Sequence, residues 1–475
     1  MKGSTSKGFL TLQVMILGGV AVIVLSGFTL WAATTLRLSL RGELRAQTFA
    51  IAEAGIEYYR WHLAHGRTDY TDGTGGPGPY THNYYDKNGD LIGQFILEII
   101  PPPLSSTGVT IKSTGHIMSD ATVEKVIKVR LEIPSFAKYA VLSNSNIRFA
   151  TNTETFGEVL SNGGIRFDGV AHNLVSSAQE KYTDPSHSSS SEFGAHTHVS
   201  PVDPFPPTAV PGRPDVFIVG RNFPVPAADF TGIARSLADL KAIAQASGTY
   251  IGISGGKGYD MILNASGTYS LYKVNSLRRL KGKTCRNLKK ETEWGSWTIR
   301  KETFASTGTI PYNGVLFVED NLWIQGTVNN ARVTIAAGKF PDSLRTRKNI
   351  IVTTSTRYTN YDGKDVVALI AQNNVNIGFA SEDSLRIDAV AVAENGRVGR
   401  YYYPNSAACA TNSVKTKITT YGMVASNQPY GFSATDGTGY GDIDLTYDAN
   451  LLYAPPPYFL LLSDQYVQIS WDEIK

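Results

Sequence analysis

An apolar segment near the N-terminus constrains the fold of this chain more than any other feature. Residues 9–33 form an apolar run without a charged side chain. Roughly 20 apolar residues in a helix cross the hydrocarbon core of a bilayer, whereas the apolar part of a cleaved secretory signal has only about 7 to 15. Lys2 and Lys7 precede the run, and positive charge favours the cytoplasmic side. The sequence therefore predicts a single-pass protein of the inner (cytoplasmic) membrane with its C-terminal body outside.

The helical pattern continues beyond the predicted membrane span, to about His65. Its apolar positions are Leu36, Leu40, Leu44, Phe49, Ile51 and Ile56. A helix of about fifty residues would be roughly 75 Å long, so we expect residues 9–66 to form one hydrophobic stem. Small residues on one side would let a second helix approach closely; these are Ala46, Ala50, Ala54 and Gly55. The alternative is an ordinary amphipathic helix that lies on its own domain.

The junction before the apolar run reads Lys7-Gly8-Phe9-Leu10-Thr11-Leu12-Gln13. It resembles the processing site of type IV prepilins and pseudopilins. The resemblance implies that residues 1–8 are a leader, and that a prepilin peptidase cuts between Gly8 and Phe9 and methylates the new amino terminus. Most major pilins have Glu at the fifth mature position, where this chain has Gln13. An amide costs less to bury unpaired than a carboxylate, which favours an accessory or tip subunit. A plain single-span anchor with a chance Gly-Phe is the alternative.

Two further segments carry a resemblance to PilX-like minor pilins. One is the stem sequence of residues 45–60, which contains Ala-Glu-Ala-Gly-Ile around Glu53. The other is the C-terminal pattern of residues 445–457 and 469–473. The resemblance implies a subunit that assembles with other pilins or pseudopilins through its N-terminal helix, with Gln13 and Glu53 as assembly residues. It also implies the cell surface or pilus as the final location, while the ligand of the body, whether glycan, DNA or another cell, stays open.

The composition favours strands and turns in the exported body. The chain has 45 Gly and 25 Tyr but only 18% charged residues, and its formal net charge of +3 does not indicate nucleic acid or an acidic surface as a partner. Alternating segments near 92–100, 109–112 and 123–133, with a turn predicted at Asn88-Gly89, indicate a small β-sheet module over residues 80–134.

One phrase of a short apolar strand followed by an Asn or Gly turn then recurs along the chain. Its copies start at Ala140, Glu158, Gly314, Ala368, Ala389 and Gly422. The first two are about 18 residues apart, near the length of one coil of a β-solenoid, and Asn at such turns can bridge adjacent rungs. We therefore expect an α+β chain with a solenoid-like body over residues 135–475. The alternative is a β-sandwich.

Two insertions and a terminal strand complete the predicted body. The insertions lie at about 184–250, which includes a helix ending at Ala246, and at 273–301, a basic segment that we expect to be a solvated, poorly packed hairpin. Contact of its two tryptophans, Trp294 and Trp297, with DNA or sugar is the alternative. We expect residues 466–471 to form a strand that caps the last coil.

The sequence contains few candidates for chemistry. His187, His196 and His198 could contribute to a metal site, with Asp203 or Glu192 completing it, but no second close-spaced ligand pair is visible and we expect no metal or cofactor. No catalytic motif is present, and we expect no enzyme.

Three further groups of residues leave alternatives open. A polysaccharide-active enzyme would use groove carboxylates such as Asp168, Asp365 and Asp388. A stand-alone adhesin would use exposed aromatic residues at positions 401–403. Cys285 and Cys409 could pair in an oxidising compartment or remain free thiols.

Overall fold

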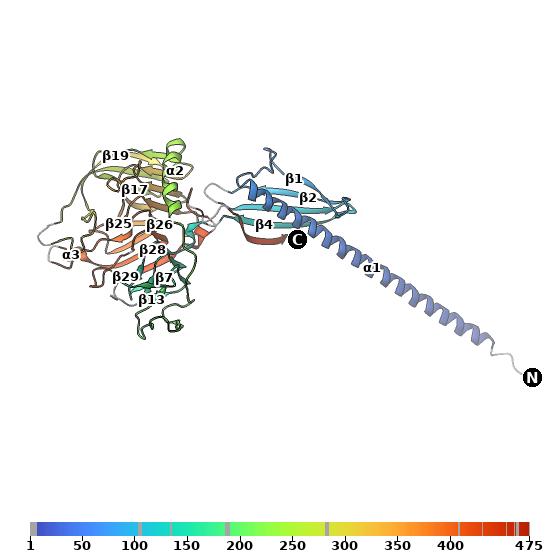
Figure 1. The fold of residues 1–475 in the computed structure, drawn as a ribbon. Coiled ribbons are helices and arrows are strands. Elements are labelled where there is room, and N and C mark those ends of the chain that lie inside the picture. Colours follow the sequence, from blue (N-terminus) through green and yellow to red (C-terminus); the bar gives the residue numbers. More distant parts are fainter. Residues whose placement is uncertain are drawn as a thin grey trace, which may run out of the picture. The chain divides into compact units, whose positions relative to one another are not determined.

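The protein is described by a computed structural model, which divides into two compact units (Figure 1). The described residues are 7–102, 107–133, 135–185, 191–280, 285–406, 409–429, 431–452, 454–459, 461 and 465–474. The N-terminal unit contains described residues up to 101, then 108–132 and 465–474. The solenoid unit contains the remainder and is thus inserted between two strands of the N-terminal unit.

The N-terminal unit is one long helix packed on an antiparallel sheet. The helix, α1, runs over Lys7–His65. The sheet has the order β1-β2-β3-β4-β30, and its strands are β1 (Tyr80–Tyr85), β2 (Leu91–Ile100), β3 (Val109–Ile117), β4 (Asp120–Glu132) and β30 (Val467–Ile474). The predicted continuous helix is confirmed, and strands β1 to β4 lie within the residues 80–134 for which we predicted a small sheet. In β3 the buried and half-buried positions alternate strictly, as expected for a sheet with one face against the helix.

Glycines let α1 approach this sheet closely. A Cβ at Gly115 in β3 would lie 2.3 Å from the carbonyl oxygen of Thr48 and 2.7 Å from the backbone nitrogen of Ala52. A Cβ at Gly55 in α1 would lie 2.3 Å from Ser113 Oγ. Because the two backbones meet at glycine, the apolar face of the helix is buried. The buried apolar side chains of α1 are Ile51, Ala52, Ile56, Tyr59 and Leu63.

The last strand of the chain belongs to this sheet. We expected residues 466–471 to cap the solenoid, and this is wrong, because β30 pairs antiparallel with β4 over Val467–Ile474. The edge of β4 is therefore covered by the end of the chain. Phe49 of the helix and Trp471 of β30 pack edge to face, with ring centroids 5.9 Å apart.

The solenoid unit consists of stacked parallel coils with three faces. The first face contains, in stacking order, β16 (Thr249–Ile251), β20 (Val315–Val318), β22 (Arg332–Ala337), β24 (Val366–Ala371), β26 (Ser384–Ala393), β28 (Val414–Ser426), β5 (Val141–Ser143), β8 (Val159–Ser161), β11 (Val175–Ser177) and β15 (Arg221–Asn222). The second contains β17 (Gly258–Asn264), β21 (Leu322–Val328), β23 (Ile350–Tyr358), β25 (Val375–Ile377) and β27 (Val398–Arg400), and, as a separate ladder, β6 (Ile147–Phe149), β9 (Ile165–Phe167) and β14 (Ala195–His196). The third is formed by the first halves of β26 and β28 with β29 (Gly439–Tyr447), β7 (Thr153–Phe156) and β10 (Val170–Ala171).

The remaining elements lie outside the coils. They are the antiparallel pairs β12 (Lys181–Thr183) with β13 (Ser191–Phe193) and β18 (Thr268–Leu277) with β19 (Ile299–Thr309), the helices α2 (Thr231–Ala246) and α3 (Ala410–Ser413), and the 3-10 turns η1 (Phe136–Lys138) and η2 (Ala449–Leu452). The helix that we predicted to end at Ala246 is α2.

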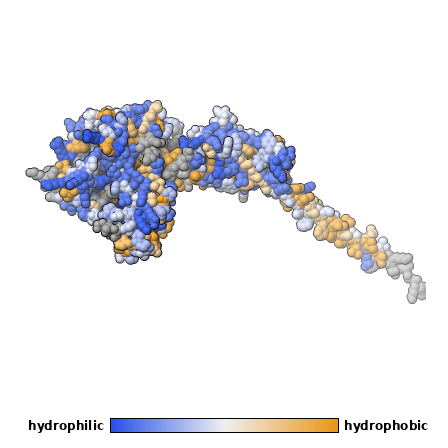
Figure 2. All heavy atoms as spheres, viewed as in Figure 1, coloured by the Kyte–Doolittle hydropathy of each residue, from blue (hydrophilic) through white to orange (hydrophobic). Residues whose placement is uncertain are grey.

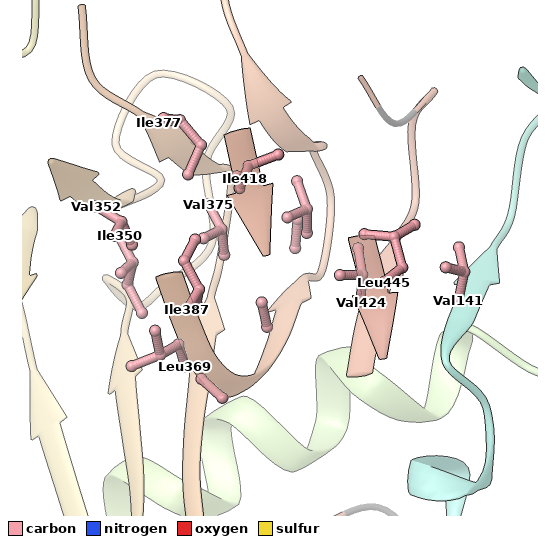
Figure 3. Packing of buried hydrophobic residues seen from close by; sticks show 14 of the residues in the cluster. Val141, Ile350, Val352, Leu369, Val375, Ile377, Ile387, Ile418, Val424 and Leu445 are labelled. Carbon is pink, nitrogen blue, oxygen red and sulfur yellow. The ribbon is translucent and has the colours of Figure 1, made fainter. Parts of the chain in front are cut away.

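The parallel pairing confirms the predicted solenoid and is incompatible with a sandwich of antiparallel hairpins. All six predicted copies of the repeated phrase lie on the first face. Strand β22 lies on the same face but was not among the predicted copies. Aliphatic residues in register fill the interior, as in the row Leu316, Ile335, Leu369 and Ala391. Figure 3 shows Leu369 with other buried side chains of this core, such as Ile350 and Val375. Asn side chains bridge rungs as predicted: Asn144 Nδ2 donates to Asn427 Oδ1 at 2.7 Å, and Asn162 Nδ2 donates to Asn144 Oδ1 at 2.7 Å.

The stacking order differs from the order along the chain. Strand β5, the first of the unit, lies between β28 and β8, so the chain starts in the middle of the stack. It winds outward to β15, then continues from β16 at the opposite end and winds back to β28 and β29. The first and last coils are thus neighbours, and Ser135 forms a bridge to Leu461 close to both connections.

Candidate functional site

The main candidate site is the apolar half of α1, which we define as residues 10–40. Every side chain in this segment is exposed in the isolated chain. Leu10, Ile16, Ile23, Phe28, Trp31 and Leu38 are each more than half exposed, and Figure 2 shows apolar residues along this part of the helix. Within the described residues, α1 is the one helix long and apolar enough to cross a membrane, by length and composition. Exposed apolar surface on this scale requires lipid or protein around it.

The residues predicted for processing and assembly lie on α1. Of the predicted leader, residues 1–6 lie outside the described residues, whereas Gly8 and Phe9 are in helical backbone. Gln13 is exposed in the apolar half, and Glu53 is exposed on the side of the stem away from the sheet. Both side chains are therefore accessible to a neighbouring subunit.

Of the four small residues that we predicted to face a second helix, Gly55 does not. Ala46 and Ala50 are exposed and Ala54 is half-buried, as a surface for a second helix requires. Gly55 instead faces the sheet of its own unit, next to Ser113 and Phe95. It serves internal packing, because the helical period of 3.6 residues places it on the side of Ala52 and Ile56.

A second candidate site is a buried group in the solenoid unit, which we call the histidine cluster: Asp184, Glu192, His196 and His198. Of the three predicted histidines, His187 lies outside the described residues. The other two lie in and directly after β14, and the hairpin β12–β13 brings Asp184 and Glu192 to them. The Nε2 atom of His196 lies 3.5 Å from Asp184 Oδ2. The Nε2 atom of His198 lies 4.0 Å from the same oxygen and 3.7 Å from Glu192 Oε1.

Burial sets the protonation of this cluster. His196 is completely buried, and burial lowers its pKa, which favours the neutral imidazole. Its Nδ1 atom lies 3.4 Å from the hydroxyl of Tyr182. Burial, with the nearby Asp184 and Glu192, raises the pKa of Tyr182 well above its usual value, so this phenol stays protonated.

Two buried carboxylates fix the backbone that carries the histidines. Asp203 accepts a hydrogen bond from the Thr197 backbone at 3.1 Å, and Asp168 accepts one from the His198 backbone at 2.9 Å. Asp203 is also held by Arg213 and Arg221, so it orients the segment and does not complete the cluster as we had considered. Sequence reasoning missed Asp184. The signal was the alternation of residues 181–184 and 191–193 around the Ser-rich loop, which indicates a hairpin.

The three carboxylates considered for catalysis have separate partners. Asp168 pairs with Arg166, whose Nε lies 2.8 Å away. Asp365 accepts bonds from the backbone of Thr359 and Asn360. Asp388 accepts bonds from the Tyr358 backbone at 3.0 Å and the Tyr361 hydroxyl at 2.7 Å, and burial raises its pKa. These contacts assign each of them a role in holding turns.

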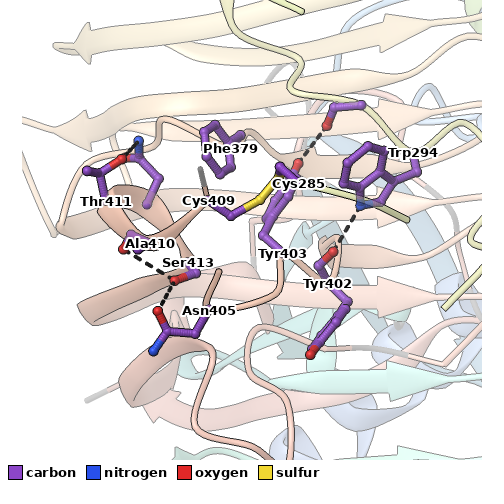
Figure 4. Close-up of a disulfide and its surroundings, with 12 residues drawn as sticks. Cys285, Trp294, Phe379, Tyr402, Tyr403, Asn405, Cys409, Ala410, Thr411 and Ser413 are labelled. Atoms are coloured by element: carbon purple, nitrogen blue, oxygen red, sulfur yellow. Dashed lines mark hydrogen bonds between the residues drawn. A yellow bond between two sulfur atoms is a disulfide. The ribbon is translucent and has the colours of Figure 1, made fainter. Parts of the chain in front are cut away.

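The basic insertion connects the antiparallel strands β18 and β19, as a hairpin does. The prediction that it is poorly packed is wrong, because it is attached to the solenoid. Cys285 and Cys409 form a disulfide with both residues buried (Figure 4). Trp294 Nε1 donates to the carbonyl of Tyr402 at 2.9 Å, and Tyr403 donates to the carbonyl of Gly295 at 2.7 Å.

The aromatic residues considered for an adhesin are mostly internal. Tyr401 and Tyr403 are buried, and only Tyr402 of the three is half-buried. Tyr403 anchors the insertion, because its ring packs on Trp294 and its hydroxyl donates to Gly295. The Tyr402 hydroxyl donates to Asp436 instead. The three tyrosines therefore do not form the exposed aromatic surface that we had considered.

Comparisons with known proteins give a limited result. No protein-family model matches the chain, and no curated protein sequence matches it. One solved structure, the competence-associated pilin ComZ from Thermus thermophilus, aligns with 91% of this chain and 98% of its own length, at 11% sequence identity and a TM-score of 0.33. A TM-score this low does not establish a shared fold, and function has to be inferred from the geometry of this chain.

Proposed function

We propose that this chain is a minor, pilin-like subunit of a type IV pilus-like filament. The proposal is supported by the division of α1 into two halves with opposite surroundings. The half after residue 44 is packed on the sheet of its own unit, whereas the side chains of residues 10–40 are exposed and mostly apolar. A stem built this way holds a folded body outside the membrane and still presents a helix to other helices.

The proposed mechanism is assembly. Before assembly the apolar half of α1 lies in the inner membrane, and afterwards the same surface packs against the helices of other pilins, which offsets the cost of leaving the lipid. A prepilin peptidase would remove residues 1–8 by cutting between Gly8 and Phe9. Gln13 and Glu53 would then contact neighbouring subunits.

The large inserted solenoid favours a tip or priming position, since a body of this size would crowd a filament wall. It would be exposed at the cell surface, where it could contact a glycan, DNA or another cell. We expect few copies in each filament, as counted by immunogold labelling along sheared filaments. Uniform labelling of the shaft would contradict the tip position but not membership in the filament.

Mass spectrometry of the N-terminal peptide tests the processing step. We expect a mature protein that starts with an N-methylated Phe9, and the Gly8→Val variant should keep its leader. An intact Met1 in the wild-type protein from a host with the peptidase would indicate a static membrane anchor instead.

A substitution on the exposed side of the stem tests assembly. Ala50→Trp places a large side chain where another helix would approach, without contact to the chain's own sheet. We expect this variant to reach the membrane in normal amounts and to be absent from sheared filaments. Tyr312→Ala, at a residue of the solenoid unit that is 89% exposed, is the matched control and should assemble normally. Equal incorporation of both variants would contradict packing through this face of α1.

A further inference from the structure

We infer that the histidine cluster is a binding site for one divalent transition-metal ion, with zinc as the ion that its ligand set fits best. The ligands are Asp184 Oδ2, His196 Nε2, His198 Nε2 and Glu192 Oε1. The inference is independent of the proposed function, because it concerns only the solenoid unit.

The distances between the ligand atoms are the first observation that supports this inference. They are 3.5 Å for His196–Asp184, 3.7 Å for His198–Glu192 and 4.0 Å for His198–Asp184. Hydrogen bonds between nitrogen and oxygen are about 2.7–3.2 Å long, so these pairs are too far apart for direct hydrogen bonds. Ligands about 2.0–2.2 Å from a tetrahedral zinc ion lie roughly 3.3–3.6 Å from one another. The Asp184, His196 and His198 atoms lie within 4.8 Å of one another and could close on one ion, whereas Glu192 Oε1, 3.7 Å from His198 Nε2, would have to move further to bind it as the fourth ligand.

Burial of the His196 Nε2 atom is the second observation that supports it. His196 is completely buried, and its Nε2 atom has no hydrogen-bond partner. A buried imidazole nitrogen without a partner is costly, and a metal ion would satisfy it. The Asp184, His196 and His198 ligand atoms lie within 4.8 Å of one another, so these three side chains converge on one point.

The surrounding groups suit a positive ion. The lone pair of a neutral imidazole binds the metal, and the Tyr182 hydroxyl next to His196 Nδ1 can orient that ring. Two carboxylates in the cluster balance the charge of a divalent cation. Arg166 lies 3.5 Å from Asp184 Oδ2 but is closer to Asp168, at 2.8 Å, so that carboxylate takes up most of its charge.

The donor set selects the ion. Two imidazole nitrogens with two carboxylates suit zinc and its neighbours, whereas calcium and magnesium prefer sites made only of oxygen. All four ligands come from the protein, and the site is buried, which indicates a structural ion. It would join hairpin β12–β13 to the coil that contains β14, near the outer end of the stack.

Zinc binding by the full chain in detergent, without an affinity tag, tests this inference. After treatment with a chelator, titration of Zn²⁺ against a competing dye should give one tightly bound ion per chain. Removal of groups that only support metal ligands costs about 10- to 100-fold in affinity, so loss of a ligand in His198→Gln or Glu192→Gln should cost at least that. The control is His172→Gln, since His172 is a partly exposed histidine 3.4 Å from Glu154 in the same unit.

Cobalt substitution keeps the test decisive if a variant misfolds. Co²⁺ bound by wild-type protein should show the intense visible absorption of a tetrahedral site, and Zn²⁺ should displace it. Absence of stoichiometric zinc binding by the wild-type chain would overturn the inference. The same conclusion would follow if folded His198→Gln and Glu192→Gln variants, checked by circular dichroism, bound zinc as tightly as the His172→Gln control.

Discussion

The close approach of α1 to its sheet at Gly115 makes a quantitative prediction. In Gly115→Val, the new Cβ would meet the Thr48 carbonyl at 2.3 Å and the Ala52 backbone nitrogen at 2.7 Å. Both obstacles are backbone atoms of a helix and cannot rotate away. Overpacking of this kind costs about 1–3 kcal/mol, which corresponds to roughly a 5- to 150-fold increase in opening of the helix from the sheet.

Hydrogen exchange followed by mass spectrometry measures this opening segment by segment. We expect faster exchange in peptides of residues 46–63 and of β3, with exchange in the solenoid unit unchanged. Gly76→Ala is the matched control, because its nearest neighbour to an added Cβ is Thr74 Oγ1 at 3.9 Å. The packing of α1 described above would be refuted by unchanged protection in Gly115→Val, or by an equal loss in both variants.

Three further predictions concern the solenoid unit. Burial raises the pKa of Asp260 to about 7, so its contribution to stability is complete below the unfolded pKa near 4 and is lost as the pH rises through 7. Urea unfolding should therefore show that the unfolding free energy decreases between pH 5 and 8, and that Asp260→Asn removes on the order of 2 kcal/mol of this decrease. Parallel pH profiles of the two proteins would count against this. Replacing Cys285 and Cys409 by Ser opens a loop with a sequence separation of 124 and should lower the unfolding free energy by up to about 5 kcal/mol. Denaturation midpoints that do not change with reductant would show that the disulfide is dispensable for stability. Leu369→Ala, at a completely buried position, should lower the unfolding free energy by about 2–5 kcal/mol. Leu344→Ala, at a 78% exposed position, should change it by less than about 0.5 kcal/mol. Similar losses in the two variants would contradict the assigned core.

Features that depend on local periodicity could be predicted from the sequence. The stem follows from the spacing of residues such as Ile51 and Ile56, and the coils follow from repeated phrases such as those at Ala140 and Glu158. Both signals arise because one face of each element has to be apolar. Local sequence also identified His196 and His198 as candidate ligands, although only His196 lies in strand β14 and His198 follows it.

Features that depend on long-range pairing could not be predicted. Nothing in the local pattern of β30 distinguishes a cap on the solenoid from an edge partner of β4, since either would protect an edge. Asp184 reaches His196 only because β12 and β13 pair, and Gly55 differs from Ala54 only in which face of α1 the sheet covers. The stacking of β5 on β28 joins segments more than 280 residues apart.

The position of β5 in the middle of the stack has a consequence for synthesis. Within the solenoid unit, coils β5 to β15 leave the ribosome first, yet one side of β5 has no neighbour until β28 has been made. The stem sheet waits even longer, because the free edge of β4 is covered only by β30. Each unit thus keeps an open strand edge during most of translation, when pairing with the wrong chain is possible. Correct folding of this chain therefore demands protection of these two edges until β28 and β30 have been made.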